Sequence, residues 1–242
     1  MDKFGKFFDD FVFHARVMPI LTAMFPIIVL CIFKGFIYKD FLDISLYTFV
    51  LLVFIFLTSK IARECGKHYE SKMYDKLGGK PTTIILRYTD CTIDNITKTR
   101  YHKVLNDKIS DLHLPLNPDE ENEESDIMYS SSMTYLRKYA NANRDVEARV
   151  YQELKEYNYW RNLYGCKWIS IIVYLLIAIR EIIIMDSFSI TNIFFKPYPQ
   201  YIAFLLMIAG IAVMCIFVNK NTVKRRAFDY AKTLAEVCES FN

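Results

Sequence analysis

Six basic side chains in the middle of the chain have the chemistry needed to bind phosphate. They are Lys80, Arg87, Lys98, Arg100, His102 and Lys103. Guanidinium and ammonium groups form charge-assisted hydrogen bonds with phosphate oxygens, and a nearby aromatic ring, such as that of Tyr88 or Tyr101, can stack on a base. The sequence therefore predicts a ligand-binding pocket for a nucleotide or a short DNA oligomer.

The charges around this basic group leave a second interpretation open. Residues 60–108 contain eleven Lys and Arg against six Asp and Glu, whereas residues 111–156 contain five against eleven. Two halves of one domain with opposite charge can simply attract each other. Six of the eight residues in Asp119–Asp126 are acidic. This run could cover the basic pocket, occupy it when no ligand is bound, or form a surface loop.

The same region lacks the motifs of a nucleotide-hydrolysing enzyme. The run Gly78-Gly79-Lys80-Pro81 looks like part of a phosphate loop. However, Tyr74 stands where the first glycine belongs, and Pro81 stands where Ser or Thr binds magnesium. The four histidines show no metal-ligand spacing, and the chain has no Gly-x-Ser-x-Gly turn. We therefore predict that the protein is not an enzyme and uses no metal or cofactor.

Four long apolar stretches flank this basic region, two before it and two after it. They are Val17–Tyr38, Ile44–Ala62, Trp168–Met185 and Tyr201–Val218. Each is close to the ~20 residues that a helix needs to cross a bilayer, where backbone groups find no other hydrogen-bond partner. The sequence predicts an all-α membrane protein. Its four transmembrane helices form two hairpins, and its central, mainly helical domain is cytosolic.

Basic residues gather on one side of the predicted spans. Lys and Arg are frequent before the first span, after the second, before the third and after the fourth, and scarce in the two outer connections. By the positive-inside rule, both termini and the central domain face the cytoplasm. The six cysteines include no Cys-x-x-Cys, which agrees with a reducing compartment. We expect a multi-pass protein of the bacterial inner (cell) membrane.

These features divide the chain into five segments. They are an interfacial amphipathic helix (1–16), transmembrane hairpin 1 (17–62), a cytosolic sensor domain (63–166), transmembrane hairpin 2 (167–218) and a cytosolic C-terminal helix (219–242). The second span is expected to continue as a helix to Leu77, where Gly78-Gly79 end it. A second continuous helix is expected from Asn143 through Trp168.

Shorter elements are expected between these two long helices. They are a short strand-like run over Thr82–Tyr88, a basic helix over Thr97–Ile109 capped by Thr97, and a helical stretch around Met128–Tyr139. The C-terminal helix carries its apolar stripe on Phe228, Ala231, Leu234 and Val237. Sheet content is expected to be small or absent.

A charge pair, Arg180-Glu181, lies near the outer end of the third predicted span. Such groups usually pair, extend to the interface, or face a water-filled path, so the pair either snorkels or contributes to the pore mouth or gate of an oligomer. Four spans with few polar residues are too few to enclose a hydrophilic path. Conduction would therefore need a homo-oligomer, for which we expect a tetramer.

The arrangement resembles four-span membrane effectors of bacterial antiphage systems. The run Gly78-Gly79-Lys80-Pro81-Thr82-Thr83, followed by Leu86-Arg87-Tyr88-Thr89-Asp90 and Thr97-Lys98-Thr99-Arg100-Tyr101-His102, looks like a family signature. By its architecture the whole chain is similar to the channel effectors of Hailong-type systems. The resemblance implies a homo-oligomeric channel held shut by DNA oligomers that a partner nucleotidyltransferase makes.

Two functions follow as expectations. The first is an oligomeric inner-membrane effector in antiphage defence, an ion channel or a membrane-disrupting protein controlled by a nucleotide or oligonucleotide. The alternative is a non-conducting membrane scaffold that recruits a cytosolic protein partner.

Overall fold

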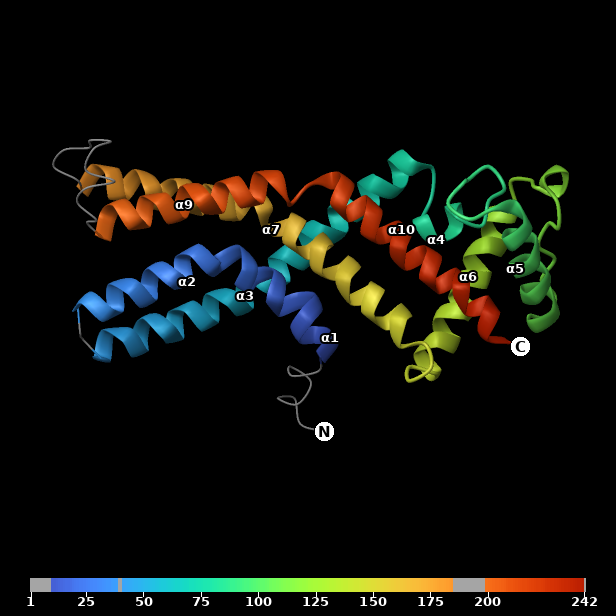
Figure 1. The fold of residues 1–242 in the computed structure, drawn as a ribbon, viewed down its shortest axis with the longest axis horizontal. Coiled ribbons are helices and arrows are strands. Elements are labelled where there is room, and N and C mark those ends of the chain that lie inside the picture. The colour runs from blue at the N-terminus through green and yellow to red at the C-terminus, as the bar shows by residue number, and fades with distance from the viewer. Residues whose placement is uncertain (1–9, 39–40, 185–198, 242) are drawn as a thin grey trace. The chain divides into compact units, whose positions relative to one another are not determined.

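The computed structural model describes residues 10–38, 41–184 and 199–241, and every regular element in those ranges is helical (Figure 1). The longer helices are α2 (Met18–Tyr38), α3 (Phe41–Leu77), α5 (Asn95–Lys108), α6 (Ser125–Ala142), α7 (Ala148–Ile184), α9 (Pro199–Ile216) and α10 (Lys220–Glu236). The short elements are α1 (Asp10–Val12), the π-helix η2 (Phe13–Val17), α4 (Pro81–Ile84), and the 3₁₀-helices η3 (Pro118–Glu120) and η4 (Val237–Phe241). The predicted all-α class is confirmed for these residues.

The strand-like run Thr82–Tyr88 is helical and turn-like, so that prediction was wrong. Pro81 occupies the first turn of α4, after Lys80 in an extended conformation. Proline fixes φ near the helical value and disfavours helical angles in the residue before it, so it starts a helix here. A lone β-branched run also has no second strand with which to pair.

The chain forms two compact units. The first comprises Met1–Tyr69 and Asn158–Thr222, and the second comprises Glu70–Tyr157 and Val223–Asn242. We call them the apolar unit and the polar unit. Helices α3 and α7 each begin in one unit and end in the other without interruption, as predicted. The polar unit is shorter than the predicted domain 63–166 at both ends, and most of the C-terminal helix belongs to it.

The apolar unit is a helical bundle whose core comes from α2, α3, α7 and α9. Its buried residues include Ile20, Ala62, Tyr174 and Met207. A Cβ atom on Gly210 of α9 would lie 2.9 Å from the ring of Pro26 and 3.0 Å from that of Tyr174. The small residue therefore lets α9 pack closely on its neighbours.

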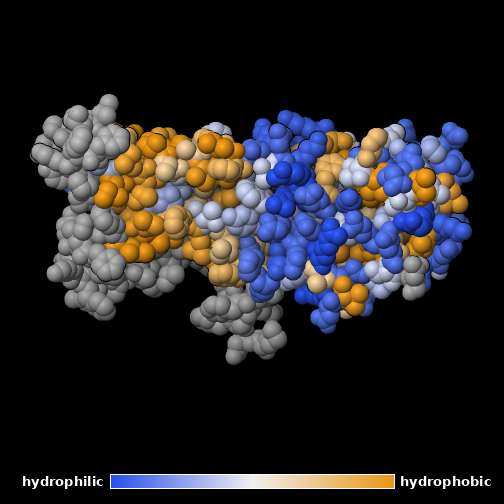
Figure 2. Space-filling model, viewed as in Figure 1, coloured by the Kyte–Doolittle hydropathy of each residue, from blue (hydrophilic) through white to orange (hydrophobic). Residues whose placement is uncertain are grey.

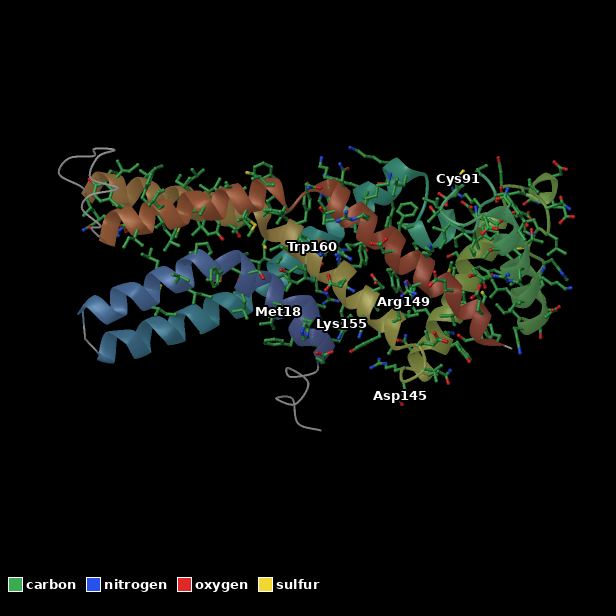
Figure 3. All side chains as sticks on the ribbon, viewed as in Figure 1. Met18, Cys91, Asp145, Arg149, Lys155 and Trp160 are labelled. Carbon is green, nitrogen blue, oxygen red and sulfur yellow. The ribbon has the colours of Figure 1, made fainter. Side chains whose placement is uncertain are left out.

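The exposed surface of the apolar unit is itself hydrophobic (Figure 2). On α7, the side chains of Trp168, Leu176 and Ile183 are 63%, 62% and 76% exposed. The opposite face of the same helix buries polar Ser170 and Glu181. The inward face also buries Tyr174 and Ala178, so what differs from a water-soluble helix is that the outward face is apolar as well.

The length and composition of the helices in the structure identify fewer candidate membrane spans than the four predicted from the sequence. Among the described residues, the helix from Asp10 to Ile32 is long and apolar enough to cross a membrane. The helices Gln200–Ile216 and Lys220–Phe241 satisfy the same criterion only as a pair, bent by 53°. The structure thus gives one candidate span, or two if the bent pair is one span, and the four predicted spans stay a prediction.

Local sequence signals set several helix ends in the polar unit. Helix α3 ends at Leu77 and is followed by Gly78 at φ +69°, with the Gly79 N–H donating to the Tyr74 carbonyl at 3.0 Å. A left-handed residue after a helix favours glycine, so the predicted stop is confirmed.

Two other helix ends differ from the prediction. The cap of α5 is Asp94, whose carboxylate accepts from the Thr97 N–H at 2.8 Å, because an Asp carboxylate is the better N-cap acceptor. Asn143 ends α6 and does not begin α7, which starts at Ala148. The predicted helix over 1–16 lies mostly outside the described residues, of which Asp10–Arg16 are helical.

Candidate ligand-binding site

Helix α5 carries four of the six predicted ligand residues, but on two different faces. Lys98 and His102 are four residues apart and point into the polar unit, where both are fully buried. Arg100 and Lys103 are exposed. Residues at i and i+4 share a helix face, whereas residues two positions away lie on another. The structure therefore does not gather the four side chains into one pocket.

Lys98 is used inside the fold. Its Nζ donates to the carbonyl of Arg87 at 2.6 Å and to the carbonyl of Asp90. These bonds fix the turns between α4 and α5. Burial lowers the pKa of Lys98, and nearby Asp90 partly offsets that effect. A buried ammonium that satisfies two carbonyls is not accessible to an outside phosphate, which corrects the predicted role of this residue.

His102 is also a core residue. Its Nδ1 lies 2.6 Å from the carbonyl oxygen of Pro115, and its ring packs between those of Tyr88 and Tyr129 with centroids 5.3 and 5.2 Å away. Nε2 is buried near the Leu86 backbone but has no well-aligned hydrogen bond within the described part of the chain. Burial lowers the pKa of His102, so the ring is neutral at pH 7.

Arg87 is bonded to the acidic run Asp119–Asp126. Its Nε donates to Asp126 Oδ1 at 2.8 Å, and its Nη2 contacts Asp126 Oδ2 and donates to the Gly78 carbonyl at 2.7 Å. The hydrogen bond to Asp126 raises the pKa of Arg87. A carboxylate thus occupies the position on the guanidinium fork that a phosphate would take.

A second acidic side chain joins the basic half of the domain at the same place. Glu121 accepts from the Tyr88 N–H at 3.2 Å and from the Tyr129 hydroxyl at 2.8 Å. The run Asp119–Asp126 is therefore folded against the segment after α4 and is not a free surface loop. The contact between Arg87 and Asp126 agrees both with the attraction of two oppositely charged halves and with an acidic run that occupies the basic site when no ligand is bound, so these two interpretations stay open.

The remaining basic residues are distributed around the unit. Lys80 is exposed and follows the Gly78-Gly79 turn that Arg87 contacts. Arg100 pairs with Glu239 of η4 at 2.7 Å. Lys103 is exposed on α5. Only Lys80 and Arg87 lie beside the same turn, so any phosphate site in this structure is smaller than the predicted one.

Sequence reasoning missed a groove on the polar unit. It has a volume of about 300 Å³ and is lined by Asn106, His113, Leu114, Pro115, Leu116, Glu120, Asn122 and Met128. The Asn106 amide donates to the Leu114 carbonyl at 3.0 Å and accepts from its N–H at 2.7 Å, which holds the irregular segment in place. No periodic pattern marks residues 109–117, so the sequence carried no signal for this groove.

The predicted pore residues lie on α7. Arg180 Nη1 is 2.7 Å from Glu181 Oε1, and the Arg180 side chain is exposed whereas that of Glu181 is buried. The pair is consistent with both predicted roles. Within the described ranges, no three His, Cys, Asp or Glu side chains form a group that could hold a metal ion.

Comparisons with known proteins add no family to this geometry. No protein-family model, no curated protein and no solved structure matches the chain. The resemblance to antiphage channel effectors and the role of a nucleotidyltransferase partner therefore stay predictions.

Proposed function

We propose that the protein is a multi-pass inner-membrane effector, with its apolar unit in the bilayer and its polar unit in the cytoplasm. The observation that carries this proposal is the surface of α7. Trp168, Ile172, Leu176, Ile179 and Ile183 are all exposed, while the polar side chains of Lys167, Ser170 and Glu181 in the same part of the helix are buried. Exposed apolar surface of this extent is costly in water and favourable in lipid.

Four spans account for this surface better than one or two. The predicted stretches Ile44–Ala62 and Trp168–Met185 lie within α3 and α7, apart from Met185, which is outside the described residues. These helices also contain long charged segments, so their composition as a whole is not that of a simple span. In the proposed arrangement only the apolar part of each helix is in lipid, and the charged part continues into the cytoplasm.

Control of the membrane helices by the polar unit follows from the same two helices. Because α3 and α7 are uninterrupted, a change at the polar end can alter the position of the apolar end. The proposed trigger is a nucleotide or short DNA oligomer that replaces Asp126 on Arg87. The proposed response is opening or closing of a homo-oligomeric ion pathway, with Arg180 and Glu181 at its mouth, in antiphage defence.

Three variants test the ligand part of the proposal. Asp126→Asn removes the competing charge and should tighten binding of labelled short oligodeoxynucleotides, whereas Arg87→Gln should abolish it. Arg137→Gln on α6, an exposed arginine elsewhere in the same unit, is the matched control. Equal binding by all three variants in a filter assay would show that the oligonucleotide does not bind at Arg87, and absence of binding by all three and by the wild type would refute the ligand itself.

A scaffold without conduction is the second candidate, because the charged halves of the polar unit already satisfy each other through Arg87 and Asp126. Ion flux from liposomes separates the two functions. A channel gives flux that depends on ligand and on Glu181→Gln, whereas a scaffold gives none in any state. Release of the protein from membranes by alkaline carbonate would refute both.

A further inference from the structure

Three segments of the apolar unit meet in direct contact at the cytoplasmic ends of the proposed spans. The Asn162 side chain on α7 donates to the Ala15 carbonyl of η2 at 2.6 Å. Where α7 crosses α3, a Cβ atom on Gly66 would lie 2.8 Å from the Arg161 carbonyl oxygen. A Cβ atom on Gly165 would lie 2.2 Å from the Ala62 carbonyl oxygen. At this junction the backbones of α3 and α7 are in direct contact, with no room for a side chain at Gly66 or Gly165.

Each of the three segments brings one arginine to this junction: Arg16 from η2, Arg63 from α3 and Arg161 from α7. The charge of Arg16 is partly buried and is repelled by Arg63 and Arg161. Within the described ranges, Arg16 and Arg63 form no ion pair and no side-chain hydrogen bond. Arg161 is buried whereas Arg16 and Arg63 are partly exposed, so water screens part of the repulsion, and an anion at this place would remove the rest.

An apolar crevice lies further along the helices from the three arginines, between α2, which follows η2 directly, α3 and α7. It has a volume of about 30 Å³, and its lining includes Ile20, Ala23, Thr58, Cys166 and Ser170. Ile20 is four residues beyond Arg16, Cys166 is five beyond Arg161, and Thr58 is five before Arg63. At 1.5 Å per residue these steps amount to about 6–8 Å, each in the direction of the proposed bilayer.

We propose that Arg16, Arg63 and Arg161 bind the phosphate of an anionic phospholipid, whose first acyl carbons enter the apolar crevice. The arrangement supplies both parts of such a ligand: guanidinium donors for the phosphate and apolar walls, about one turn deeper, for the chain. Basic sites between helices at the cytoplasmic interface suit acidic headgroups. Free phosphate would use the arginines alone. The inference rests on the proposed membrane location of the apolar unit.

Native mass spectrometry of the full-length protein in detergent tests the proposal with three probes. Phosphatidylglycerol carries both the phosphate and the chains, glycerol 3-phosphate carries only the phosphate, and phosphatidylcholine carries the chains with a neutral headgroup. We expect phosphatidylglycerol to bind at one site, about tenfold or more tightly than either other probe. The double variant Arg16→Gln/Arg63→Gln should weaken this binding about tenfold.

The matched control is Lys220→Gln/Lys224→Gln, which removes the same charge from two exposed lysines after α9. It should bind phosphatidylglycerol like the wild type. Equal weakening by both double variants would show a general electrostatic effect and overturn the site. Equal binding of glycerol 3-phosphate would overturn the lipid assignment. Carbonate extraction, run in parallel, separates these failures from failure of the membrane location itself.

Discussion

Gly165→Ala is expected to destabilise the apolar unit because it places a methyl group between two backbones. The new Cβ would lie 2.2 Å from the Ala62 carbonyl oxygen and 2.6 Å from the Gly66 nitrogen, whereas ordinary contact begins at 3.4 Å. Both partners are backbone atoms, so no rotamer change relieves the clash. Helices α3 and α7 must instead move apart by roughly 1 Å, which loosens the packing along their crossing.

The size of the effect follows from two opposing terms. Overpacking a well-packed core costs about 3 kcal/mol at the upper end of its usual range, while alanine stabilises a helix interior by about 1 kcal/mol relative to glycine. The expected net loss is about 2 kcal/mol. For a chain of this size it corresponds to a fall of about 4–8 °C in the melting temperature. Size-exclusion chromatography after heating in detergent measures this shift.

Three comparison variants make the reasoning refutable. Gly66→Ala meets the Arg161 carbonyl at 2.8 Å and should be milder, and Gly210→Ala meets side-chain atoms at 2.9 and 3.0 Å and should be milder still. Ala62→Gly should not rescue Gly165→Ala, because the obstructing atom of residue 62 is its carbonyl oxygen. A Gly165→Ala protein as stable as the wild type, or rescue by Ala62→Gly, would refute this account of the crossing.

Three further outcomes are expected in the polar unit. A double-mutant cycle of Arg87→Ala and Asp126→Ala in chemical denaturation should give a coupling of about 1 kcal/mol, because the pair is hydrogen-bonded but partly exposed; additive effects would argue against the bond. Burial holds the pKa of His102 below its unfolded value of 6.5, so the unfolded chain binds more protons and the wild type should lose stability as the pH falls below 6.5. The His102→Gln protein should lack that loss, and equal pH slopes for the two proteins would show that the ring is not buried and neutral. Cys91 is exposed whereas burial raises the pKa of Cys238 to about 12, so an impermeant maleimide should label Cys91 but not Cys238, and in spheroplasts Cys91 should be labelled only after permeabilisation. Labelling of Cys238 at the same rate would contradict its burial, and labelling of Cys91 from outside would contradict the orientation.

Periodicity and glycine positions in the sequence were enough to predict most of the helices. The long helices α3 and α7 follow from continuous 3.6-residue patterns, and the end of α3 follows from Gly78-Gly79, since both signals are local. The prediction of a strand-like run over Thr82–Tyr88 was wrong because these residue types favour a strand only when another strand pairs with it. The prediction of Thr97 as the N-cap of α5 was wrong because Asp94 and Thr97 are both good cap residues, and only the folded structure shows which of them caps the helix.

The candidate site was predicted less well because charge in a sequence does not show where a side chain points. Lys98 and Arg100 are two residues apart and equally basic, yet one is buried on two carbonyls and the other is exposed beside Glu239. The difference depends on which face of α5 packs inward. The sequence does not show that face, because the buried residues of α5 do not form an apolar stripe: they are Lys98, Tyr101, His102 and Leu105.

The buried polar side chains of the polar unit also bear on the proposed response to a ligand. Besides apolar residues such as Leu105 and Met133, the core of the polar unit contains Lys98 and His102, which are held by hydrogen bonds that another polar group could replace. The contact of Asp126 with Arg87 is accessible from solvent, since the Asp126 side chain is 43% exposed. A phosphate that displaced it would also compete with the bond from Arg87 to the Gly78 carbonyl, at the point where α3 ends. If a ligand binds Arg87 as proposed, the same guanidinium group would link that ligand to the end of α3.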